Sequence, residues 1–253
     1  HEGRRARQGP AVTTRLRALA VALSLFAGPA SAQDWNIQVT PYAWGAGVGG
    51  EVRPLPGGPS LEFEQGLSEV LEDLDAAFFL SGYARRGRLV FLVDLSSSAS
   101  SRAGVVPGLG LPARGEVEQR SLTLAAGYRA YGGPEFTLDV LAGLRRWSIE
   151  AAATTPVPGL GAGVDIDFTD PIVALRTNVP ISERWSLIAY GDVGGFGVGS
   201  DRTGQIVATL NWQATPSLYL SAGYRHLFVD YDDGGPALDV TFSGPLLGVT
   251  YRF

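Results

Sequence analysis

Arginine and aspartate recur at alternate positions in several segments of the sequence. In "FTLDVLAGLRRW", Asp139 and Arg145 share one face of an extended chain, and the opposite face is apolar. A charge removed from water must be paired, because an isolated one costs several kcal/mol or more. Opposite charges on one face therefore predict an internal network of salt bridges or, alternatively, a narrow polar pathway lined by Arg and Asp.

The same alternation places further polar side chains in this environment. The motif "AGYR" or "AGLR" recurs at Ala126–Arg129, Ala142–Arg145 and Ala222–Arg225, where the glycine leaves room for a long arginine two residues later on the same face. Arg252 is expected at the edge of this set. We expect the network to consist of Tyr42, Asp94, Arg129, Asp139, Arg145, Asp170, Arg176, Asp192, Asn211 and Arg225.

His226 is the residue that an enzymatic mechanism would most need. A nucleophile and its general base must lie within hydrogen-bond reach. Alternation places His226 on the face opposite Arg225, and its nearest acids in the sequence are Asp230, Asp232 and Asp233. This arrangement indicates a histidine at the surface or rim, so we predict no catalytic residue and no enzymatic activity.

Two acidic stretches offer oxygen ligands for Ca²⁺, namely "DYDDGG" at 230–235 and "DIDFTD" at 165–170. Neither has the twelve-residue spacing of an EF-hand, so solvated acidic loops are expected. The chain has no Cys, which removes disulfides and zinc-thiolate sites. We therefore predict neither a metal site nor a cofactor.

The elements that must position these residues are long strands separated by turns. About ten segments alternate in character, although eight or twelve strands would also fit. Tight turns at 86–87, 132–134, 180–184 and 215–217 alternate with mostly longer loops. An even number of strands with tight turns at one end is typical of an outer-membrane barrel. The predicted strands cover roughly 34–52, 76–86, 88–101, 115–131, 135–151, 164–179, 185–198, 202–214, 218–231 and 238–253.

Periodicity alone fits two opposite barrels equally well. A secreted lipocalin-like barrel would turn its apolar face inward, and a membrane barrel would turn it toward lipid. The aromatic residues favour the membrane barrel, because those on the apolar face gather beside the tight turns, as in an interfacial girdle. The expected girdle consists of Trp35, Phe136, Trp185, Trp212, Tyr251 and Phe253.

The end of the chain, Tyr251-Arg252-Phe253, resembles the last strand of bacterial outer-membrane β-barrel proteins. The opening "TPYAW" and the repeated "AGYR" and "AGLR" segments are similar to small members of that class. The resemblance implies a monomer surrounded by outer-membrane lipid and lipopolysaccharide in a Gram-negative bacterium. It also implies that the barrel-assembly machinery recognises the terminal strand, with Phe253 in the girdle and the last strand closing against the first.

One segment has the pattern of a helix. In "EQGLSEVLEDLD" the apolar Leu67, Val70, Leu71 and Leu74 recur with helical spacing, and Ser68 is the expected N-cap. We expect a short helix in the first extracellular loop, 53–75. It could be a plug whose acids meet lumenal arginines, or equally a surface helix. The acids concerned are Glu69, Glu72 and Asp73.

The beginning of the chain has the parts of an export signal. The absence of Met predicts a start within the printed chain, at Val12 if its codon is GTG. A basic stretch is followed by the apolar segment 18–27 and by Ala30-Ser31-Ala32 as a cleavage site. We thus divide the chain into 1–32, an upstream extension with a cleaved signal peptide, and 33–253, the barrel. Cleavage would make the formal charge more negative than the −5 of the whole chain, which disfavours nucleic acid as a partner.

Together these observations predict an all-β protein, a single closed antiparallel transmembrane barrel with a charge-filled lumen. A structural or envelope role without enzymatic activity is the expected function. A narrow channel for small solutes is the alternative, and an envelope enzyme acting on lipid A or peptide is a third possibility.

Overall fold

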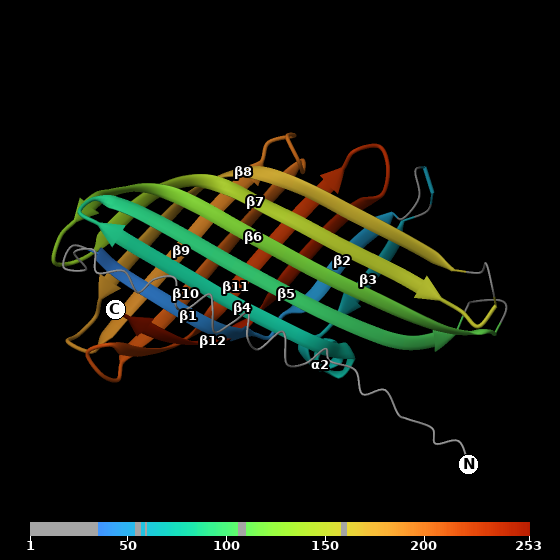
Figure 1. Cartoon of the computed structure of the whole chain (residues 1–253), viewed down its shortest axis with the longest axis horizontal. Coiled ribbons are helices and arrows are strands. Elements are labelled where there is room, and N and C mark those ends of the chain that lie inside the picture. The colour runs from blue at the N-terminus through green and yellow to red at the C-terminus, as the bar shows by residue number, and fades with distance from the viewer. Residues whose placement is uncertain (1–34, 54–56, 59, 106–109, 158–160) are drawn as a thin grey trace, which may run out of the picture. The chain divides into compact units, whose positions relative to one another are not determined.

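The computed structural model describes residues 35–53, 57–58, 60–105, 110–157 and 161–253. The predicted upstream extension and signal peptide therefore lie outside the described residues. Within the described part of the chain, every long segment is a β-strand, and the strands form one antiparallel wall (Figure 1). The strands are β1 (Trp35–Trp44), β2 (Gly47–Arg53), β3 (Leu61–Gln65), β4 (Leu74–Arg86), β5 (Leu89–Val105), β6 (Pro112–Gly132), β7 (Thr137–Thr154), β8 (Ala162–Pro180), β9 (Trp185–Gly195), β10 (Arg202–Gln213), β11 (Leu218–Asp232) and β12 (Ala237–Arg252).

The wall closes on itself and has ten strand positions, which confirms the predicted fold. β1 and β2 follow one another along β12, and β3 and β4 follow one another in the next position. Pairing of β1 with β12 sets Gln38 opposite Arg252 and closes the barrel. The backbone N–H of Phe253 donates to the carbonyl of Ile37 at 3.0 Å, so pairing of the chain end with β1 holds it in place.

The two ends of the barrel differ in the way predicted. Short connections join β4 to β5, β6 to β7, β8 to β9 and β10 to β11, and the C-terminus lies at this turn end (Figure 1). The first of these turns needs Gly87, whose φ of 58° lies in the left-handed region that favours glycine. The opposite end, the loop end, carries most of the longer connections, and some of their residues lie outside the described part.

The segment predicted as the first loop, 53–75, contains the predicted short helix, but the prediction missed a strand of the wall in the same segment. β3 pairs with β2, and the helix α2 (Leu67–Asp73) joins β3 to β4. Its N-cap is Gly66 rather than Ser68, and the Glu69 carboxylate accepts the Gly66 N–H at 2.9 Å. Leu67 packs beside Gly45, where β1 breaks from β2. None of the described helical residues forms a segment long and apolar enough to cross a membrane.

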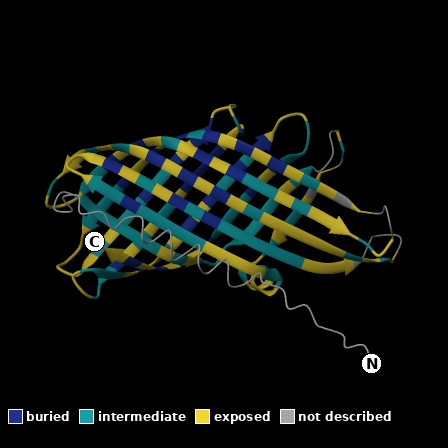
Figure 2. Ribbon diagram, viewed as in Figure 1, coloured by how far each residue is buried: buried dark blue, intermediate teal, exposed yellow. Residues whose placement is uncertain are grey.

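Buried and exposed residues alternate along the strands (Figure 2), but the kinds of residue on the two faces change about halfway along the barrel. In the turn-end half of β7, Val140 and Leu144 are exposed on the outside, whereas Asp139 and Arg145 are buried inside. Toward the loop end the order reverses, because Trp147 is buried inside and Glu150 is exposed outside. β11 reverses in the same way next to its lumenal arginine. The outer surface meets an apolar environment around the turn-end half and water around the other half, and this difference accounts for the switch.

The apolar outer band has the height that a bilayer requires. It runs from Phe136, directly before β7, to Leu144 within that strand, which matches the roughly 9–11 residues of a transmembrane strand. Beyond it, Arg146 and Glu150 face outward and the strands continue as an aqueous projection. The membrane orientation thus describes the turn-end half, and the lipocalin-like alternative describes the projecting half.

Candidate functional site

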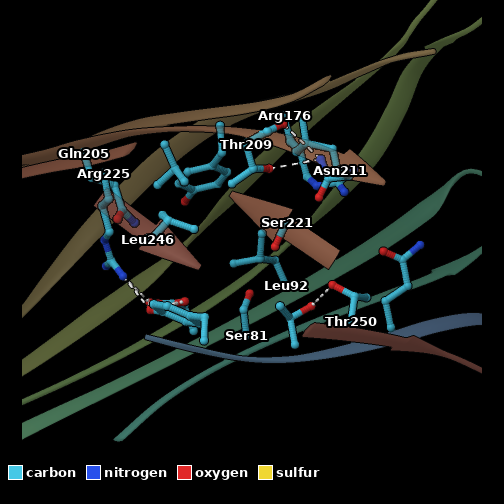
Figure 3. Close-up of a pocket in the computed structure, with 17 residues that line it drawn as sticks. Ser81, Leu92, Arg176, Gln205, Thr209, Asn211, Ser221, Arg225, Leu246 and Thr250 are labelled. Atoms are coloured by element: carbon cyan, nitrogen blue, oxygen red, sulfur yellow. Dashed lines mark hydrogen bonds and ion pairs between the residues drawn. The ribbon is translucent and has the colours of Figure 1, made fainter. Parts of the chain in front are cut away.

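The charged residues predicted for the internal network lie in the lumen of the turn-end half, where most of them form three groups of contacts. The first group crosses the lumen between strands that are not neighbours. Arg225 on β11 contacts Asp94 on β5 at 3.2 Å, and Tyr42 on β1 donates to the same carboxylate at 3.0 Å (Figure 3). The Arg225 Nη1 lies 2.6 Å from the Tyr42 hydroxyl, and its guanidinium lies over the Trp44 ring at 4.6 Å.

The second group joins Arg145 to Asp192 by two hydrogen bonds of 2.6 and 3.0 Å. Both side chains have zero exposure. Gln205 donates to Asp192 at 2.9 Å, and the Arg145 Nε donates to Thr123 at 3.1 Å. Pairing together with these additional hydrogen bonds is the arrangement in which a buried ion pair can be maintained.

The third group lies nearer the turn end and centres on Asp139. Arg129 binds this carboxylate through two hydrogen bonds of 2.7 and 3.2 Å, and the Tyr83 hydroxyl donates to it at 3.0 Å. Arg176 is 3.6 Å from the same carboxylate and stacks over the Tyr83 ring at 4.1 Å. One carboxylate therefore serves two guanidiniums.

Asp170 and Asn211 are buried as the sequence suggested, but they make other contacts. Asp170 accepts the Ser200 backbone N–H at 2.6 Å and its hydroxyl at 2.8 Å. These bonds hold the short turn after β9, where Phe196 has a φ of 54°. The Asn211 amide donates to the Thr209 carbonyl at 2.9 Å. Both residues belong to local structure rather than to the three groups.

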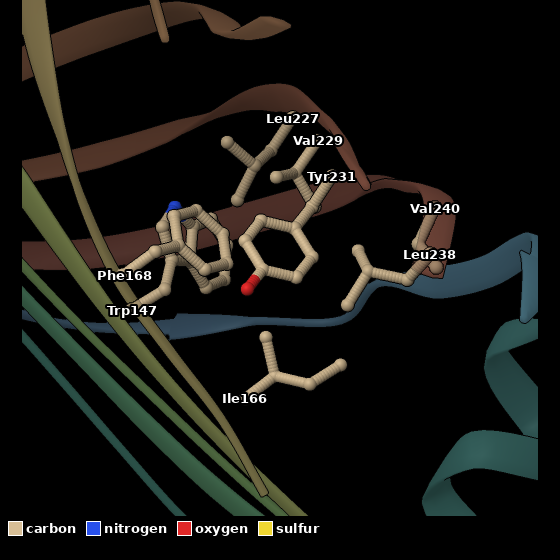
Figure 4. Close-up of a cluster of buried hydrophobic side chains, with 8 residues drawn as sticks. All are labelled: Trp147, Ile166, Phe168, Leu227, Val229, Tyr231, Leu238 and Val240. Atoms are coloured by element: carbon tan, nitrogen blue, oxygen red, sulfur yellow. The ribbon is translucent and has the colours of Figure 1, made fainter. Parts of the chain in front are cut away.

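Above the charged groups, toward the loop end, the lumen is filled by apolar side chains (Figure 4). The Phe168 and Tyr231 rings stack with centroids 4.6 Å apart, and Trp147 is fully buried beside them. This apolar cluster was not predicted from the sequence. The pattern was present, because Leu227 and Val229 continue the face of Arg225. The cluster consists of Trp147, Ile166, Phe168, Leu227, Val229, Tyr231, Leu238 and Val240.

Two cavities lie below the apolar cluster. A central cavity of about 150 Å³ has Tyr42, Asp94 and Arg225 in its lining (Figure 3). A vestibule of about 270 Å³ lies at the turn end, between Arg85 and Arg252. The cavities have five lining residues in common, so they adjoin. The shared residues are Gln38, Arg176, Ile188, Asn211 and Thr250.

The fold that carries these groups is similar to that of a solved outer-membrane protein. The chain is similar to the outer membrane protease OmpT from Escherichia coli, with a TM-score of 0.53, 12% identity, and coverage of 88% of this chain and 98% of that one. The fold is that of an outer-membrane β-barrel. At this identity the likeness concerns the fold alone. No family model matches the sequence.

Further barrels resemble the chain more distantly. Ail, the attachment invasion locus protein of Yersinia pestis, has 15% identity and a TM-score of 0.39 over 87% of this chain and 99% of that one. The translocator domain of the autotransporter NalP from Neisseria meningitidis has 16% identity and a TM-score of 0.42 over 95% of each chain. No curated protein sequence matches.

The residues of the expected aromatic girdle lie at the turn end, mostly in pairs. Ring centroids are 6.4 Å apart for Trp185 and Trp212 and 4.8 Å apart for Tyr251 and Phe253. Trp35 lies 6.0 Å from Phe91, and Phe136 stacks on Tyr131 at 4.5 Å. Phe91 and Tyr131 were not predicted, although alternation places Phe91 on the same face.

The placement of α2 favours the surface helix over the plug. Glu69 is exposed and accepts a hydrogen bond from its own N-cap, and Glu72 is exposed. Asp73 lies 3.5 Å from Arg102, which is itself 60% exposed on the projecting part of β5. These contacts join the helix to the outer projection instead of directing its acids at the lumenal arginines.

His226 faces outward at the edge of the apolar band. Its Nδ1 lies 2.6 Å from the Ser243 hydroxyl on β12.

Farther out, beyond the band, the Gly234 backbone N–H and the Arg53 guanidinium lower the pKa of Asp232. Among the described residues, no group of three or more His, Asp or Glu is arranged to hold a metal ion.

The recurring glycines have a different role from the predicted one. A Cβ on Gly127, Gly143 or Gly223 would lie 2.0–2.1 Å from a carbonyl oxygen of the neighbouring strand. The contact is with backbone, not with the arginine two residues later. These glycines therefore permit close approach of adjacent strands.

Proposed function

We propose that this chain is an integral protein of the Gram-negative outer membrane whose lumen is closed to solutes. In this orientation the turn end faces the periplasm and the projection faces outward. The exposed apolar band would contact lipid, and the charged residues just above it, such as Arg120 and Arg146, would lie beside lipopolysaccharide. A structural or envelope role follows from a barrel that neither conducts nor catalyses.

One observation supports this proposal, namely that two different sets of side chains, ion pairs and aromatic rings, cross or fill the same lumen. The pairs Arg225–Asp94 and Arg145–Asp192 cross it in the turn-end half. The stacked rings of Phe168 and Tyr231 fill it above. An ion would have to break a buried salt bridge and then enter an apolar region, and both steps are costly.

Planar-bilayer recording of the refolded protein tests the proposal. We expect no steady ion current from the unmodified barrel. A variant that removes both barriers, Arg145→Ala and Arg225→Ala together with Phe168→Ala and Tyr231→Ala, should conduct if it inserts. Steady conductance of the unmodified protein would reject the closed barrel and support the second candidate, a narrow channel for small solutes. The adjoining cavities favour that candidate, since they extend partway through the barrel from the turn end.

A hydrolase of envelope lipid or peptide is a third candidate, because Ser243 lies within reach of His226. A catalytic histidine also needs a group that orients its second ring nitrogen. Within the described residues, the polar contact of the His226 ring is with Ser243, so that orienting group is missing. We therefore propose a non-enzymatic protein. Hydrolysis of lipid A or of a peptide by the purified protein, abolished by His226→Ala, would overturn this.

The terminal strand is the proposed contact for the barrel-assembly machinery. Tyr251 and Phe253 are exposed on the outer surface, and their rings lie edge to face. Replacing Phe253 by Ser removes the last ring while leaving the Phe253 N–H bond possible. We expect less folded barrel in the outer membrane of cells but unchanged refolding in detergent. Equal amounts in cells would remove the support for this contact.

A further inference from the structure

The turn-end vestibule has a charge opposite to that of the protein as a whole. The full chain carries a formal charge of −5, yet the vestibule lining contains five arginines and one glutamate. Such a concentration in one cavity would not follow from the average composition. The charged lining residues are Arg85, Arg129, Arg176, Arg184, Arg252 and Glu183.

The carboxylates present do not neutralise these arginines. Asp139 takes two short hydrogen bonds from Arg129, which leaves it 3.6 Å from Arg176. Arg252 donates to the neutral Tyr219 hydroxyl at 3.2 Å, and Arg85 donates to the Gly87 carbonyl at 2.7 Å. By contrast, each arginine of the two deeper groups has a carboxylate of its own. The excess positive charge is thus confined to the open end of the lumen.

Arg176 is the arginine of this set whose charge most needs a partner. Its side chain is only 10% exposed, and a guanidinium stays protonated in proteins. It is shared between both cavities, so its charge lies where the vestibule narrows. A charge in a cleft with protein walls interacts more strongly with a bound ion than it would in water. An anion beside Arg176 would complete the neutralisation that Asp139 only begins.

We propose that the vestibule is a binding site for a small oxyanion, a molecule that carries a phosphate or carboxylate group. Guanidiniums favour these groups because their planar donors match two oxygens at once. The ligand would enter from the turn end, which is the periplasm in the proposed orientation. It could not pass farther, because the Arg225–Asp94 pair closes the cavity above. The site is therefore a blind pocket that binds without transport.

Calorimetric titration of the refolded protein in detergent tests this, with inorganic phosphate and succinate as probes at constant ionic strength and chloride as the reference anion. We expect saturable binding of at least one probe. Arg176→Gln and Arg252→Gln should each weaken it about tenfold, as the loss of one charge-assisted contact of about 1.4 kcal/mol would do. Preference between the probes would identify the chemical group.

Matched controls lie on the outer wall. Arg120 and Arg146 are 60% and 63% exposed and pair with Glu118 and Asp167. Arg120→Gln and Arg146→Gln make the same charge change and should leave binding intact. If Arg176→Gln does not refold, Arg252→Gln with Arg184→Gln at the open end gives the same test.

Two results would overturn the proposal. One is the absence of saturable binding of both probes, and the other is equal weakening by the outer-wall controls, which would indicate general charge effects. Bilayer recording separates this inference from the proposed function. A conducting barrel that still loses binding with Arg252→Gln would keep the site and reject the closed lumen. A closed barrel without binding would reject the site alone.

Discussion

Arg145 and Asp192 join strands β7 and β9 across the intervening β8, through two hydrogen bonds in a region without solvent exposure. A buried pair loses most when one partner is removed, because the other charge is left without compensation. We expect Asp192→Asn to lower the free energy of unfolding by about 3–5 kcal/mol. Urea unfolding of the refolded protein, followed by near-UV circular dichroism, measures this change.

The exposed Arg146 provides the control for this measurement, because its partner Asp167 is also exposed. Asp167→Asn should change the free energy of unfolding by less than about 1 kcal/mol. A similar loss in the two variants would mean that burial does not decide the contribution of the pair. The double variant Arg145→Met with Asp192→Leu should lose less than Asp192→Asn alone, since no buried charge is left unpaired.

The apolar cluster should contribute as the core of a soluble domain does. Trp147 is fully buried among side chains of β8, β11 and β12. We expect Trp147→Ala to lower the free energy of unfolding by about 3–5 kcal/mol, through lost burial and the cavity that remains. Val198→Ala, at a side chain that is 71% exposed, should have almost no effect. Equal unfolding curves for Trp147→Ala and the unmodified protein would contradict a packed cluster.

The turn-end half of the barrel could be predicted in detail from the sequence. Side chains alternate there between lipid and a polar interior, so period two alone assigns residues such as Asp139 and Leu144 to their faces. The projecting half was missed because its outer solvent is water. The inner face of Arg225 continues with the apolar Leu227 and Val229. The prediction assumed that the whole strand crosses lipid, and a strand of that kind has a polar inner face throughout.

Partners within the lumen could not be predicted for a different reason. Contacts such as Arg225 with Asp94 join positions 131 residues apart, and they depend on barrel closure and strand stagger rather than on local pattern. Asp170 illustrates the limit, because alternation placed it inside correctly while its partner is the backbone of the turn at Ser200. The sequence therefore predicts the face on which a side chain lies, whereas its contact partner depends on barrel closure and strand stagger.

The recurring glycines provide a test of strand approach. A Cβ at Gly127, Gly143 or Gly223 would meet backbone that cannot move without shifting a strand. We expect Gly127→Ala to lower the free energy of unfolding by about 1–3 kcal/mol, as overpacking does. Gly104 has open space around it, so Gly104→Ala is the control and should be nearly neutral or slightly stabilising. If Gly127→Ala were equally neutral, packing would not explain the repeats.

The five tryptophans offer a test of which surface meets lipid. Trp35, Trp185 and Trp212 belong to the girdle on the outer face, whereas Trp44 and Trp147 face the lumen. In vesicles with brominated acyl chains, variants that retain one tryptophan should show strong quenching for Trp185 and weak quenching for Trp147, because bromine quenches only near the ring. Such variants replace the other four tryptophans by Phe.

Depth adds a second criterion to that experiment. Girdle residues lie near the headgroups, so Trp185 and Trp212 should be quenched more by bromine high on the chain than by bromine near its end. A soluble-type barrel would instead leave all five tryptophans insensitive to lipid bromine. Strong quenching of Trp147 together with weak quenching of Trp185 would show that the apolar and polar faces are assigned the wrong way round.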